Sequence, residues 1–590
     1  MTTSAEVGRV SGMHLLFYTI FGDVIASSTP SLTASLSLLL SIVLRILGLS
    51  TPVGLGLFSP QSPITSGMAV PMQQGHVTGT SDFQVLILGG GVTGVMAAKT
   101  LHRRGIDNFK IIEARETLGG RMKSFSFGAA GREYVLELGA DWIHGTQTNN
   151  GPSNPIFDLA RKHNLSTQPN HYRGSMTTYD HTGLVDYMQT FNTAVDNFAA
   201  LTVGGVDTTT RSGYALLGAK PRTPHEAASE YYQFDWEYAQ TPEQSSWLAS
   251  SWVTYPLYTS QSRLLFRRVM IKSPTRSQIV LVCPQPCCSS RVFQANNFTF
   301  NRDQGGFSTE NLLTTDQRGF ASVIQSEAAE FISEEQVLLN ATVKAIKYSD
   351  DRVWVSLSDE TSLSADYALV TFSLGVLQHD DVLFEPALPK WKSEAIHGMA
   401  MGTYTKIYLQ FPEKFWFDTE FALYADHERG WYPVWQSLDI DGFFPGSGVL
   451  FVTVTGDFSK RIESMSDQVV KAEVLAVLRS MYPNTTIPEP DAFYFPRWQS
   501  DPLYRGSYSN WPSSFLRSHH TNLRATVGQR LWFGGEATSF KYFGYLHGAY
   551  YEGQKMAEEI VNCMEDGGCD GLPHVEEIPC SHPYIASDFI

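Results

Sequence analysis

The clearest pattern in the chain lies between residues 84 and 121, where the spacing of apolar positions changes repeatedly. Residues 84–88 form a short apolar run that meets a glycine cluster at residues 89–94. Residues 95–104 continue at helical spacing, and residues 109–112 form a second apolar run. A strand, a glycine turn, a helix and a second strand in this order predict a βαβ unit.

The turn of this unit carries glycines at the spacing Gly-x-Gly-x-x-Gly. Gly89 permits a tight turn, Gly91 lets the backbone approach a pyrophosphate, and Gly94 packs the helix on the strand. The N-terminus of the helix then faces the phosphates, and Glu113 is placed to bind ribose hydroxyls. The pattern predicts dinucleotide binding, with NAD and FAD both open, and its alternative is an ordinary α/β turn.

Further periodic segments follow along the chain. The helical segments are 155–165, 187–201 and 546–563. Residues 338–348 and 352–357 are expected to form a strand pair, a hairpin around residues 349–351, and residues 367–377 a buried strand and turn. Residues 231–239 mix acidic and aromatic side chains, as a core helix with one solvent-facing edge does.

The first 81 residues do not have the pattern of an enzyme core. Residues 36–44 are apolar and stop before Arg45. This length suits the hydrophobic part of a secretory signal, about 7–15 residues, better than a membrane span of about 20. Residues 51–80, rich in Gly, Pro, Ser and Thr, predict a disordered linker. We therefore expect a secreted protein, with a membrane anchor or a soluble arm as the alternatives. The glycosylation sequons, which are compatible with secretion, begin at Asn164, Asn297, Asn340 and Asn484.

Residues 253–294 interrupt the patterned sequence with six basic residues, no acidic residue and three of the six cysteines. This composition predicts a disordered insertion, and the alternative is a basic loop that binds a partner. The cysteines do not have zinc-site spacing, so no metal is expected. Cys563 and Cys569 could close a small loop if the protein is exported.

The length of 590 residues and the 43% hydrophobic content allow a large core, and two domains are expected. The formal net charge of −16 argues against nucleic acid as a partner and favours small cationic molecules.

Gly119-Gly120-Arg121, close behind Glu113, resembles the GGR motif of FAD-dependent amine oxidases, whose arginine helps to hold the cofactor. Without this resemblance, the two glycines would be interpreted as an ordinary loop. The resemblance decides between the two dinucleotides and implies FAD.

Residues 134–145 resemble the ELGAxWxHG stretch of flavin-dependent polyamine oxidases. In that family the Gly-Ala-x-Trp backbone lies against the flavin, and the histidine position faces the substrate. Taken alone, Trp142 could be a core residue and His144 a structural histidine.

Lys406 lies in an apolar strand of alternating character, where an ammonium group is costly. A lysine at the end of a strand usually extends to water. The surrounding sequence is similar to the polyamine oxidase strand whose lysine holds a water beside flavin N5. This similarity favours a catalytic role for Lys406.

Residues 531–538 and 544–549 resemble the second FAD signature of amine oxidases, a strand, a Gly-Glu pair, a loop and a long helix. The positive N-terminal end of that helix would stabilise negative charge on a reduced flavin. Glu536 is expected to bind the ribityl hydroxyls. Tyr508 and Tyr545 match the aromatic walls that flank the substrate amine, with core packing as the alternative. Glu237 matches an active-site glutamate of plant polyamine oxidases.

The resemblance therefore implies two sets of site residues and no metal ligand. The catalytic set is Lys406, His144, Glu237, Tyr508 and Tyr545. The cofactor-binding set is Gly89, Gly91, Gly94, Glu113, Arg115, Gly120, Arg121, Gly139, Ala140, Asp141, Trp142, Val343 on the adenine side, Trp498, Gly535, Glu536, Tyr545 and Leu546.

The resemblance extends from Asp82 to about Cys569, apart from the insertion, and implies the amine oxidase fold. This α/β fold combines a Rossmann-like FAD-binding domain with a second, mixed α+β substrate domain. The expected boundaries are 82–152, 318–382 and 495–563 for the FAD-binding domain, 153–317 and 383–494 for the substrate domain, and 564–590 for a C-terminal tail.

The implied activity is that of an FAD-dependent polyamine oxidase of the plant and fungal type. It would take a hydride from the carbon beside an amine of spermine, spermidine or their acetylated forms to flavin N5. The resulting imine hydrolyses to an aldehyde and an amine, and O2 is reduced to H2O2.

Two residues depart from the family. His144 stands where plant enzymes commonly have glutamate and animal back-converting enzymes have histidine, and Asp141 stands where the family has Asn or Thr. The side of the amine that is cleaved and the oligomeric state stay open.

Three alternatives remain. L-Amino-acid oxidases need an arginine for the substrate carboxylate, and no motif of this sequence supplies one. Histone lysine demethylases need added chromatin-binding modules. A catalytically silent flavoprotein with a basic interaction loop is disfavoured by Lys406 and by the intact FAD motifs.

Overall fold

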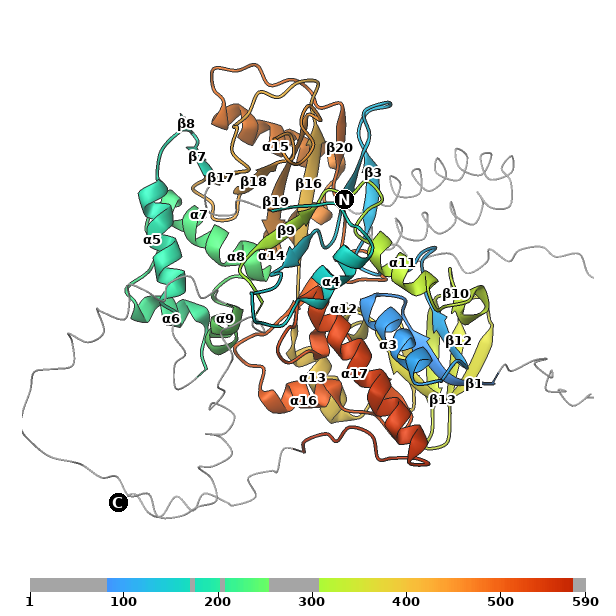
Figure 1. Cartoon of the computed structure of the whole chain (residues 1–590). Helices are drawn as coiled ribbons and strands as arrows, with labels where there is room; N and C mark the ends of the chain where they lie inside the picture. The colour runs from blue at the N-terminus through green and yellow to red at the C-terminus, as the bar shows by residue number, and fades with distance from the viewer. Residues whose placement is uncertain (1–81, 170–175, 202–206, 254–306, 577–590) are drawn as a thin grey trace, which may run out of the picture. The chain divides into compact units, whose positions relative to one another are not determined.

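The computed structural model describes residues 82–169, 176–201, 207–253 and 307–576 (Figure 1). The signal-like segment, the linker and residues 254–294 of the predicted insertion lie outside these ranges. All described residues belong to one compact unit, Thr78–Ile590. Within the described ranges, no helix is long and apolar enough to cross a membrane.

The first large sheet contains the predicted βαβ unit. Its strand order is β10 (Val337–Leu338), β2 (Phe109–Ile112), β1 (Asp82–Leu88), β13 (Ser362–Val370), β12 (Val353–Leu357), β11 (Val343–Tyr348) and β14 (Leu383–Glu385), with β22 (Leu531–Phe533) also paired to β13. Strands β10, β2, β1, β13 and β22 run parallel to one another, whereas β12 is antiparallel to both β13 and β11. Strands β12, β11 and β14 thus extend a parallel sheet.

Strand β1 is apolar throughout its buried part because both of its faces are covered. Val85 and Ile87 pack toward helices α3 (Val92–Arg103) and α17 (Leu546–Glu565), while Leu86 and Leu88 pack into the core on the other face. Such a strand reads as a continuous apolar run, as parallel strands buried on both faces do.

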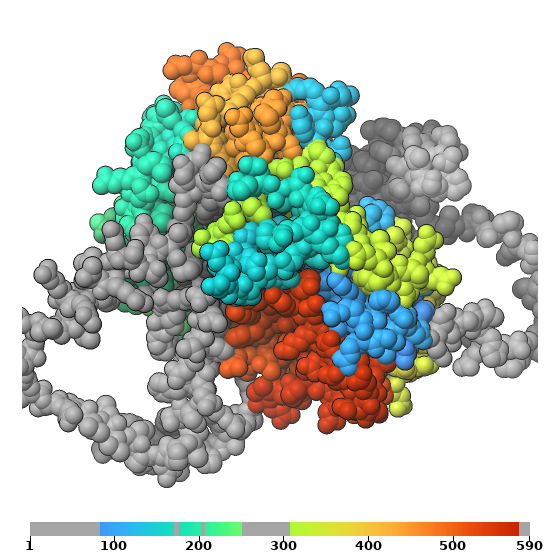
Figure 2. Space-filling model, viewed as in Figure 1, coloured from blue at the N-terminus to red at the C-terminus, as the bar shows by residue number. Residues whose placement is uncertain are grey.

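Helices α3 and α17 lie side by side on the sheet (Figure 1), although about 450 residues separate them along the chain. A Cβ atom on Gly553 of α17 would lie 2.3 Å from the carbonyl oxygen of Thr93 of α3, so this close packing requires glycine. Figure 2 shows the same neighbourhood as blue and red surfaces that meet on one face. The long helix predicted at 546–563 is confirmed.

The single strand predicted at 338–348 is wrong. Leu338 belongs to β10, which pairs with β2, and β11 begins only at Val343. Between them Asn340 has a positive φ of 55°, a left-handed conformation that ends a strand. The predicted hairpin of β11 and β12 around residues 349–351 is present.

The second large sheet has the order β20 (Ala492–Tyr494), β16 (Tyr404–Gln410), β19 (Val449–Thr455), β18 (Val434–Ser437), β17 (Phe421–Ala425), β7 (Met176–Asp180) and β8 (Gly183–Leu184). Ile407 and Leu409 of β16 share a core with α15 (Asp467–Met481). Because side chains alternate along a strand, Tyr404, Lys406 and Tyr408 face the opposite side. There the Tyr408 hydroxyl donates to the carbonyl oxygen of Glu137 at 2.7 Å.

Smaller elements complete the described fold. The small sheets pair β15 (Ala400–Gly402) with β21 (Tyr508–Asn510), β3 (Ser124–Phe127) with β4 (Tyr134–Glu137), and β9 (Asn311–Thr314) with both β5 (Trp142–His144) and β6 (Thr167–Pro169). The remaining helices are α4 (Pro155–Lys162), α5 (Met188–Ala199), α6 (Thr210–Leu216), α7 (Pro224–Gln233), α8 (Asp235–Tyr238), α9 (Trp247–Val253), α11 (Ser322–Ala329), α12 (Leu374–Leu377), α13 (Lys390–Gly398), α14 (Gly456–Glu463), α16 (Arg517–Arg524) and the 3₁₀ turns η3 (Glu334–Gln336) and η4 (Glu536–Thr538). The domain boundaries given above stay a prediction.

A disulfide joins Cys563, in the last turn of α17, to Cys569 in the segment that follows. It closes the small loop that the sequence allowed. The compartment in which it forms is a separate question.

Candidate active site

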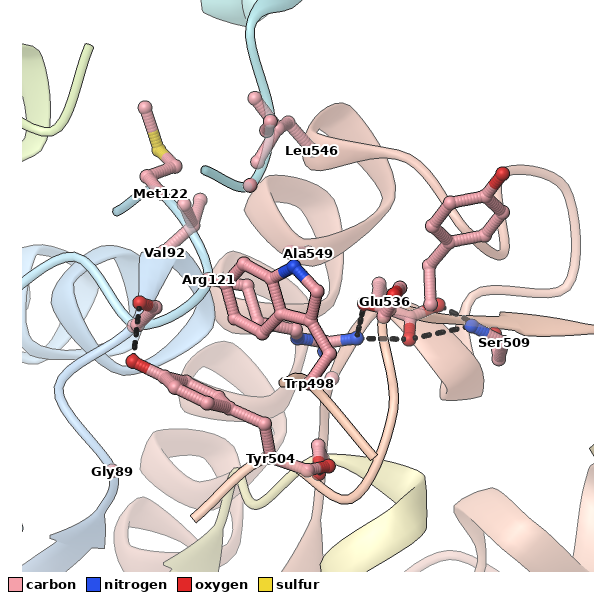
Figure 3. A pocket seen from close by; sticks show the side chains of 18 of the residues that line it. Gly89, Val92, Arg121, Met122, Trp498, Tyr504, Ser509, Glu536, Leu546 and Ala549 are labelled. Carbon is pink, nitrogen blue, oxygen red and sulfur yellow. Dashed lines mark hydrogen bonds and ion pairs between the residues drawn. The ribbon is translucent and has the colours of Figure 1, made fainter. Parts of the chain in front are cut away.

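One cavity of about 650 Å³ brings the predicted site residues together (Figure 3). Every residue of the predicted catalytic and cofactor-binding sets lines this cavity except Gly94. We name its two parts after the ligands that the sequence predicts: the nucleotide end includes Gly91 and Glu113, and the amine end includes Lys406 and Tyr508.

The nucleotide end is formed by two glycine turns that approach each other. A Cβ atom on Gly120 would lie 3.1 Å from the Cα atom of Gly91, so a side chain at position 120 would crowd the first turn. Gly91 is the N-cap of α3 and makes no side-chain cap hydrogen bond. The backbone N–H groups at the start of α3 therefore face the cavity wall without a side chain between them and a ligand.

Gly94, in the first turn of α3, has the structural role that the motif predicts. A Cβ atom there would lie 2.0 Å from the carbonyl oxygen of Gly89. Gly94 thus lets the helix approach the turn and does not itself line the cavity.

Glu113 closes the first turn from the side. Its carboxylate accepts hydrogen bonds from the backbone N–H of Gly90 at 2.7 Å and of Arg115 at 2.8 Å. Burial raises the pKa of Glu113, and these two hydrogen bonds oppose the rise. Arg115 pairs with Asp501 and lies over the ring of Tyr504 at 4.8 Å from the centroid.

Arg121 and Glu536 join the GGR motif to the second FAD signature (Figure 3). Arg121 Nη1 lies 2.9 Å from Glu536 Oε1, and the Glu536 carboxylate also accepts from the N–H groups of Ser509 at 3.1 Å and Gly544 at 2.7 Å. Glu536 therefore holds three chain segments together at the cavity wall. Its binding of ribityl hydroxyls stays a prediction.

These features fit a dinucleotide. The glycine turns leave space that a Cβ atom at position 120 would fill in part, and the start of α3 offers uncapped N–H groups, as a bound pyrophosphate requires. An acidic side chain, that of Glu113, borders the turn, as the ribose requires.

At the amine end, Lys406 is buried, with 3% of its surface exposed. Its Nζ donates to the carbonyl oxygen of Gly139 at 2.8 Å and of Glu137 at 3.3 Å, and it lies 2.6 Å from Asp141 Oδ2. The lysine thus does not extend to bulk water. It is held in the cavity wall by the segment that carries the ELGAxW motif.

Glu237, at the end of the predicted acidic and aromatic segment, lies between the two tyrosines. The Tyr545 hydroxyl donates to Glu237 Oε1 at 2.9 Å, and the Tyr508 hydroxyl donates to the Glu237 carbonyl oxygen at 3.0 Å. One short helical turn therefore fixes both rings at the amine end.

His144 meets the same group from β5. Its ring lies edge-on to Tyr545, with centroids 5.0 Å apart, and its buried Nδ1 has no hydrogen-bond partner among the described residues. Burial lowers the pKa of His144, so the imidazole is uncharged at neutral pH.

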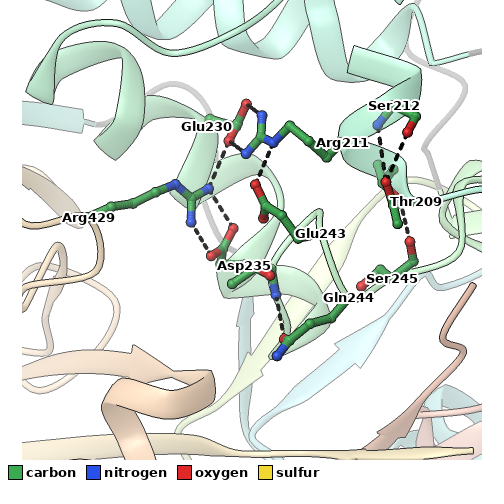
Figure 4. Close-up of polar contacts among 11 residues, drawn as sticks. Thr209, Arg211, Ser212, Glu230, Asp235, Glu243, Gln244, Ser245 and Arg429 are labelled. Carbon is green, nitrogen blue, oxygen red and sulfur yellow. Dashed lines mark hydrogen bonds and ion pairs between the residues drawn. The ribbon is translucent and has the colours of Figure 1, made fainter. Parts of the chain in front are cut away.

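An ion network fixes the short helix α8 that presents Glu237 (Figure 4). Arg429 pairs with Asp235 and with Glu230, and Arg211 pairs with Glu230 and Glu243. Burial raises the pKa of Asp235 to about 6, against the opposing effect of Arg429. Asp235 is the first residue of α8, so the network fixes the position at which the helix that carries Glu237 begins.

Sequence reasoning missed several residues that line the cavity, chiefly Tyr404, Tyr504 and Asn311. The Tyr404 ring lies 6.0 Å from that of Tyr508. Its position two residues before Lys406 was the available signal, since alternate residues of a strand share a face. Tyr504, whose hydroxyl donates to the Gly120 carbonyl oxygen at 3.1 Å, had no comparable local signal.

Comparison with known proteins agrees with this geometry. Residues 92–561 match the family described as flavin containing amine oxidoreductase. The chain is 34% identical to polyamine oxidase 1 of Zea mays over 529 residues, which covers 84% of this chain and 94% of that protein. It is 33% identical to polyamine oxidase 6 of Oryza sativa subsp. japonica, over 84% of this chain and 93% of that protein. A solved structure of putrescine oxidase bound to putrescine shares the fold, with a TM-score of 0.59 at 16% identity, covering 82% of this chain and 100% of that chain.

Proposed function

Because the chain belongs to the flavin-containing amine oxidoreductases, we propose that it oxidises polyamines with bound FAD and O2. The observation that carries this proposal is the amine end of the cavity. A buried lysine, a glutamate and two tyrosines line it, and it is continuous with a glycine-lined nucleotide end.

Bound FAD supplies the acceptor for a hydride from the carbon beside the amine nitrogen, and passes two electrons to O2 to give H2O2. The oxidised amine is an imine, which water hydrolyses to an aldehyde and a shorter amine. The contribution of the protein is to bind, orient and exchange protons with the substrate.

Tyr508 and Tyr545 form the walls between which the amine is held, because Glu237 fixes both hydroxyls. The Glu237 carboxylate attracts the cationic substrate, and the neutral His144 does not repel it. Hydride loss needs the amine without its extra proton. Glu237 Oε1 and His144 Nδ1 are the groups at this end that can accept that proton.

Lys406 holds its ammonium group at the cavity wall, next to the backbone of Gly139. We assign to it the movement of a proton at Nζ during the reaction with O2. This role follows from its burial beside the predicted flavin-facing segment.

The absorbance spectrum of the purified full-length protein tests the function. We expect a flavin spectrum that bleaches on anaerobic addition of spermine and returns with O2, with H2O2 formed in equal amount to the amine consumed. Acid or heat should release the cofactor, since residues 534–538 of the second FAD signature contain no Cys or His that could bind the flavin covalently. A flavin spectrum that no polyamine bleaches would contradict the proposal.

We also propose that the protein enters the secretory pathway. The Cys563–Cys569 disulfide is typical of oxidising compartments, and Asn164, Asn340 and Asn484 of the sequons are exposed. Expression in a eukaryotic cell with and without a glycosidase treatment tests this. Protein that stays in the cytosol, unglycosylated and with free thiols, would contradict it.

A further inference from the structure

We propose that Asp141 is a positioning residue that acts through Lys406, by supplying the charged acceptor that fixes the ammonium group in the cavity wall. Asp141 Oδ2 lies 2.6 Å from Lys406 Nζ, and 265 residues separate the two along the chain. Both side chains are buried, with 11% and 4% of their surfaces exposed. The ion pair is therefore formed out of bulk water, where it is little screened.

The acceptors of Lys406 all lie in the short stretch from the end of β4 to the residue before β5. They are the carbonyl oxygens of Glu137 and Gly139 and the side chain of Asp141. An ammonium group has three donors, and this segment provides three acceptors.

An asparagine or a threonine at position 141 would give a neutral acceptor in place of the carboxylate. An amide or a hydroxyl would still accept one hydrogen bond from Lys406. It would not cancel the charge of the ammonium group, whereas the carboxylate adds a Coulomb attraction that is stronger away from bulk water. The aspartate therefore converts a hydrogen-bonded lysine into an ion pair at the cavity wall.

The other acidic side chains nearby, as far as the structure describes the chain, have different partners. Glu137 accepts from the Ser124 hydroxyl and from the N–H of Phe320, and Glu237 accepts from the Tyr545 hydroxyl. The remaining titratable groups that feel the charge of Asp141 are His144, Tyr404, Tyr408 and Tyr508. Among the described residues, Asp141 is the acidic side chain that forms a salt bridge with Lys406.

A double-mutant cycle on the full chain with FAD tests the pairing through thermal stability. Lys406→Met leaves the carboxylate of Asp141 buried without its partner, which is destabilising. Adding Asp141→Asn removes that carboxylate. We expect the double variant to melt about 2 °C or more above Lys406→Met. A double variant that melts at or below Lys406→Met would overturn the proposal. If the Met variants do not fold, Lys406→Gln replaces them in the same cycle.

Asp207→Asn provides a matched control. Asp207 also has a carboxylate held by the chain, accepting from the Ser246 hydroxyl at 2.8 Å and the N–H of Leu248 at 3.2 Å, and it does not line the cavity. Its effect should be the same with and without Lys406. Rescue of Lys406→Met by Asp207→Asn as well would show that the rescue is not specific to the ion pair, and would overturn the proposal.

Flavin kinetics provide the second readout, and this part rests on the role proposed for Lys406. Asp141→Asn should lower the rate of flavin reduction or reoxidation per bound FAD by about tenfold, which is about 1.4 kcal/mol of barrier. In the Lys406→Met background it should change neither rate by more than about threefold. Equal losses in both backgrounds, or parental rates in Asp141→Asn alone, would overturn a positioning role. Parental rates in Lys406→Met with a positive melting cycle would instead refute the catalytic role of Lys406 and leave the ion pair standing.

Discussion

The two ends of the cavity differ in which atoms form their walls, backbone atoms at one end and side chains at the other. At the nucleotide end, backbone atoms of two short glycine turns and of the start of α3 form the wall. The Glu113 carboxylate stabilises the first turn by accepting a hydrogen bond from the backbone N–H of Gly90. At the amine end, the wall consists of side chains that come from separate parts of the chain. These are Asp141, Glu237, Lys406, Tyr508 and Tyr545.

Substitutions at the two ends should therefore have different consequences. The nucleotide end depends on the absence of side chains, so substitutions there should weaken FAD binding. The amine end depends on charges and rings that distant residues hold in place, so substitutions there should slow flavin reduction or reoxidation while FAD stays bound.

The largest effect is expected for Lys406→Met at the amine end. Removal of a positioned proton-transfer group typically costs about 10²–10⁴-fold in rate, so flavin reduction, reoxidation or both should slow by that factor. Stopped-flow absorbance with spermine, first without and then with O2, measures each half-reaction per bound FAD. Rates within about threefold of the parent, under about 1 kcal/mol of barrier, would show that Lys406 has no catalytic role.

Lys392 provides the matched control for this prediction. It is a second fully buried lysine, whose Nζ donates to the carbonyl oxygens of Leu523 and Ala525 at 2.7 Å, and it does not line the cavity. Lys392→Met should lower the melting temperature and leave turnover per bound FAD unchanged. A purely structural Lys406 would behave in the same way.

The next effect concerns the side chain of Glu137, whose backbone carbonyl oxygen accepts from Lys406 Nζ. Burial raises the pKa of Glu137 from 4.5 to about 7. A raised pKa means that its contribution to stability is full below pH 4.5 and is lost as pH rises through about 7. Relative to Glu137→Gln, the parent should lose about 3 kcal/mol of unfolding free energy between pH 4 and pH 8.

Denaturant unfolding of parent and Glu137→Gln across this pH range measures the effect. Because the two proteins share all other titrating groups, their difference isolates Glu137. A difference that does not change with pH would mean that Glu137 titrates normally in the folded protein.

A smaller effect is expected at the nucleotide end for Gly94→Ala. The added Cβ atom would lie 2.0 Å from the Gly89 carbonyl oxygen, and overpacking of this kind costs about 1–3 kcal/mol. FAD affinity should fall by about tenfold or more, together with the melting temperature, while the rates per bound FAD persist.

Gly91→Ala separates the effect on FAD binding from the effect on the fold. Its Cβ atom would lie 3.8 Å from the Gly120 Cα atom, an ordinary contact, so the protein itself should tolerate it. We expect weaker FAD binding at an unchanged melting temperature of the FAD-free full chain. Equal effects of the two substitutions on melting would show that both glycines serve the fold alone.

The smallest effect is expected for Tyr508→Phe. The ring stays in the wall, and only the hydrogen bond from the hydroxyl to the Glu237 carbonyl oxygen is lost, which is worth about 1 kcal/mol. The value of kcat/KM for spermine should fall about fivefold, and Tyr508→Ala should lower it further because the wall itself is removed. Equal losses for Phe and Ala would place the whole contribution in the hydroxyl.

The comparison of the two ends also explains which predictions from sequence held. Strand β1, the glycine turn and helix α3 are contiguous, and their spacing alone indicated their structure. Helix α17 could also be predicted, because one long segment with helical periodicity forms it. The predicted strand at 338–348 failed because Leu338 has a better partner in β2, about 230 residues earlier, than in its own hairpin.

The sequence by itself determined the βαβ unit, the long final helix and a large minority of the cavity residues, because short-range spacing and motifs carry that information. Only the tertiary structure decided how the charges are matched. The pairing of Asp141 with Lys406, of Arg121 with Glu536 and of Arg429 with Asp235 joins residues 194 to 415 positions apart. Whether a buried charge is neutralised depends on which groups lie within a few ångströms after folding, and spacing along the chain does not specify that distance.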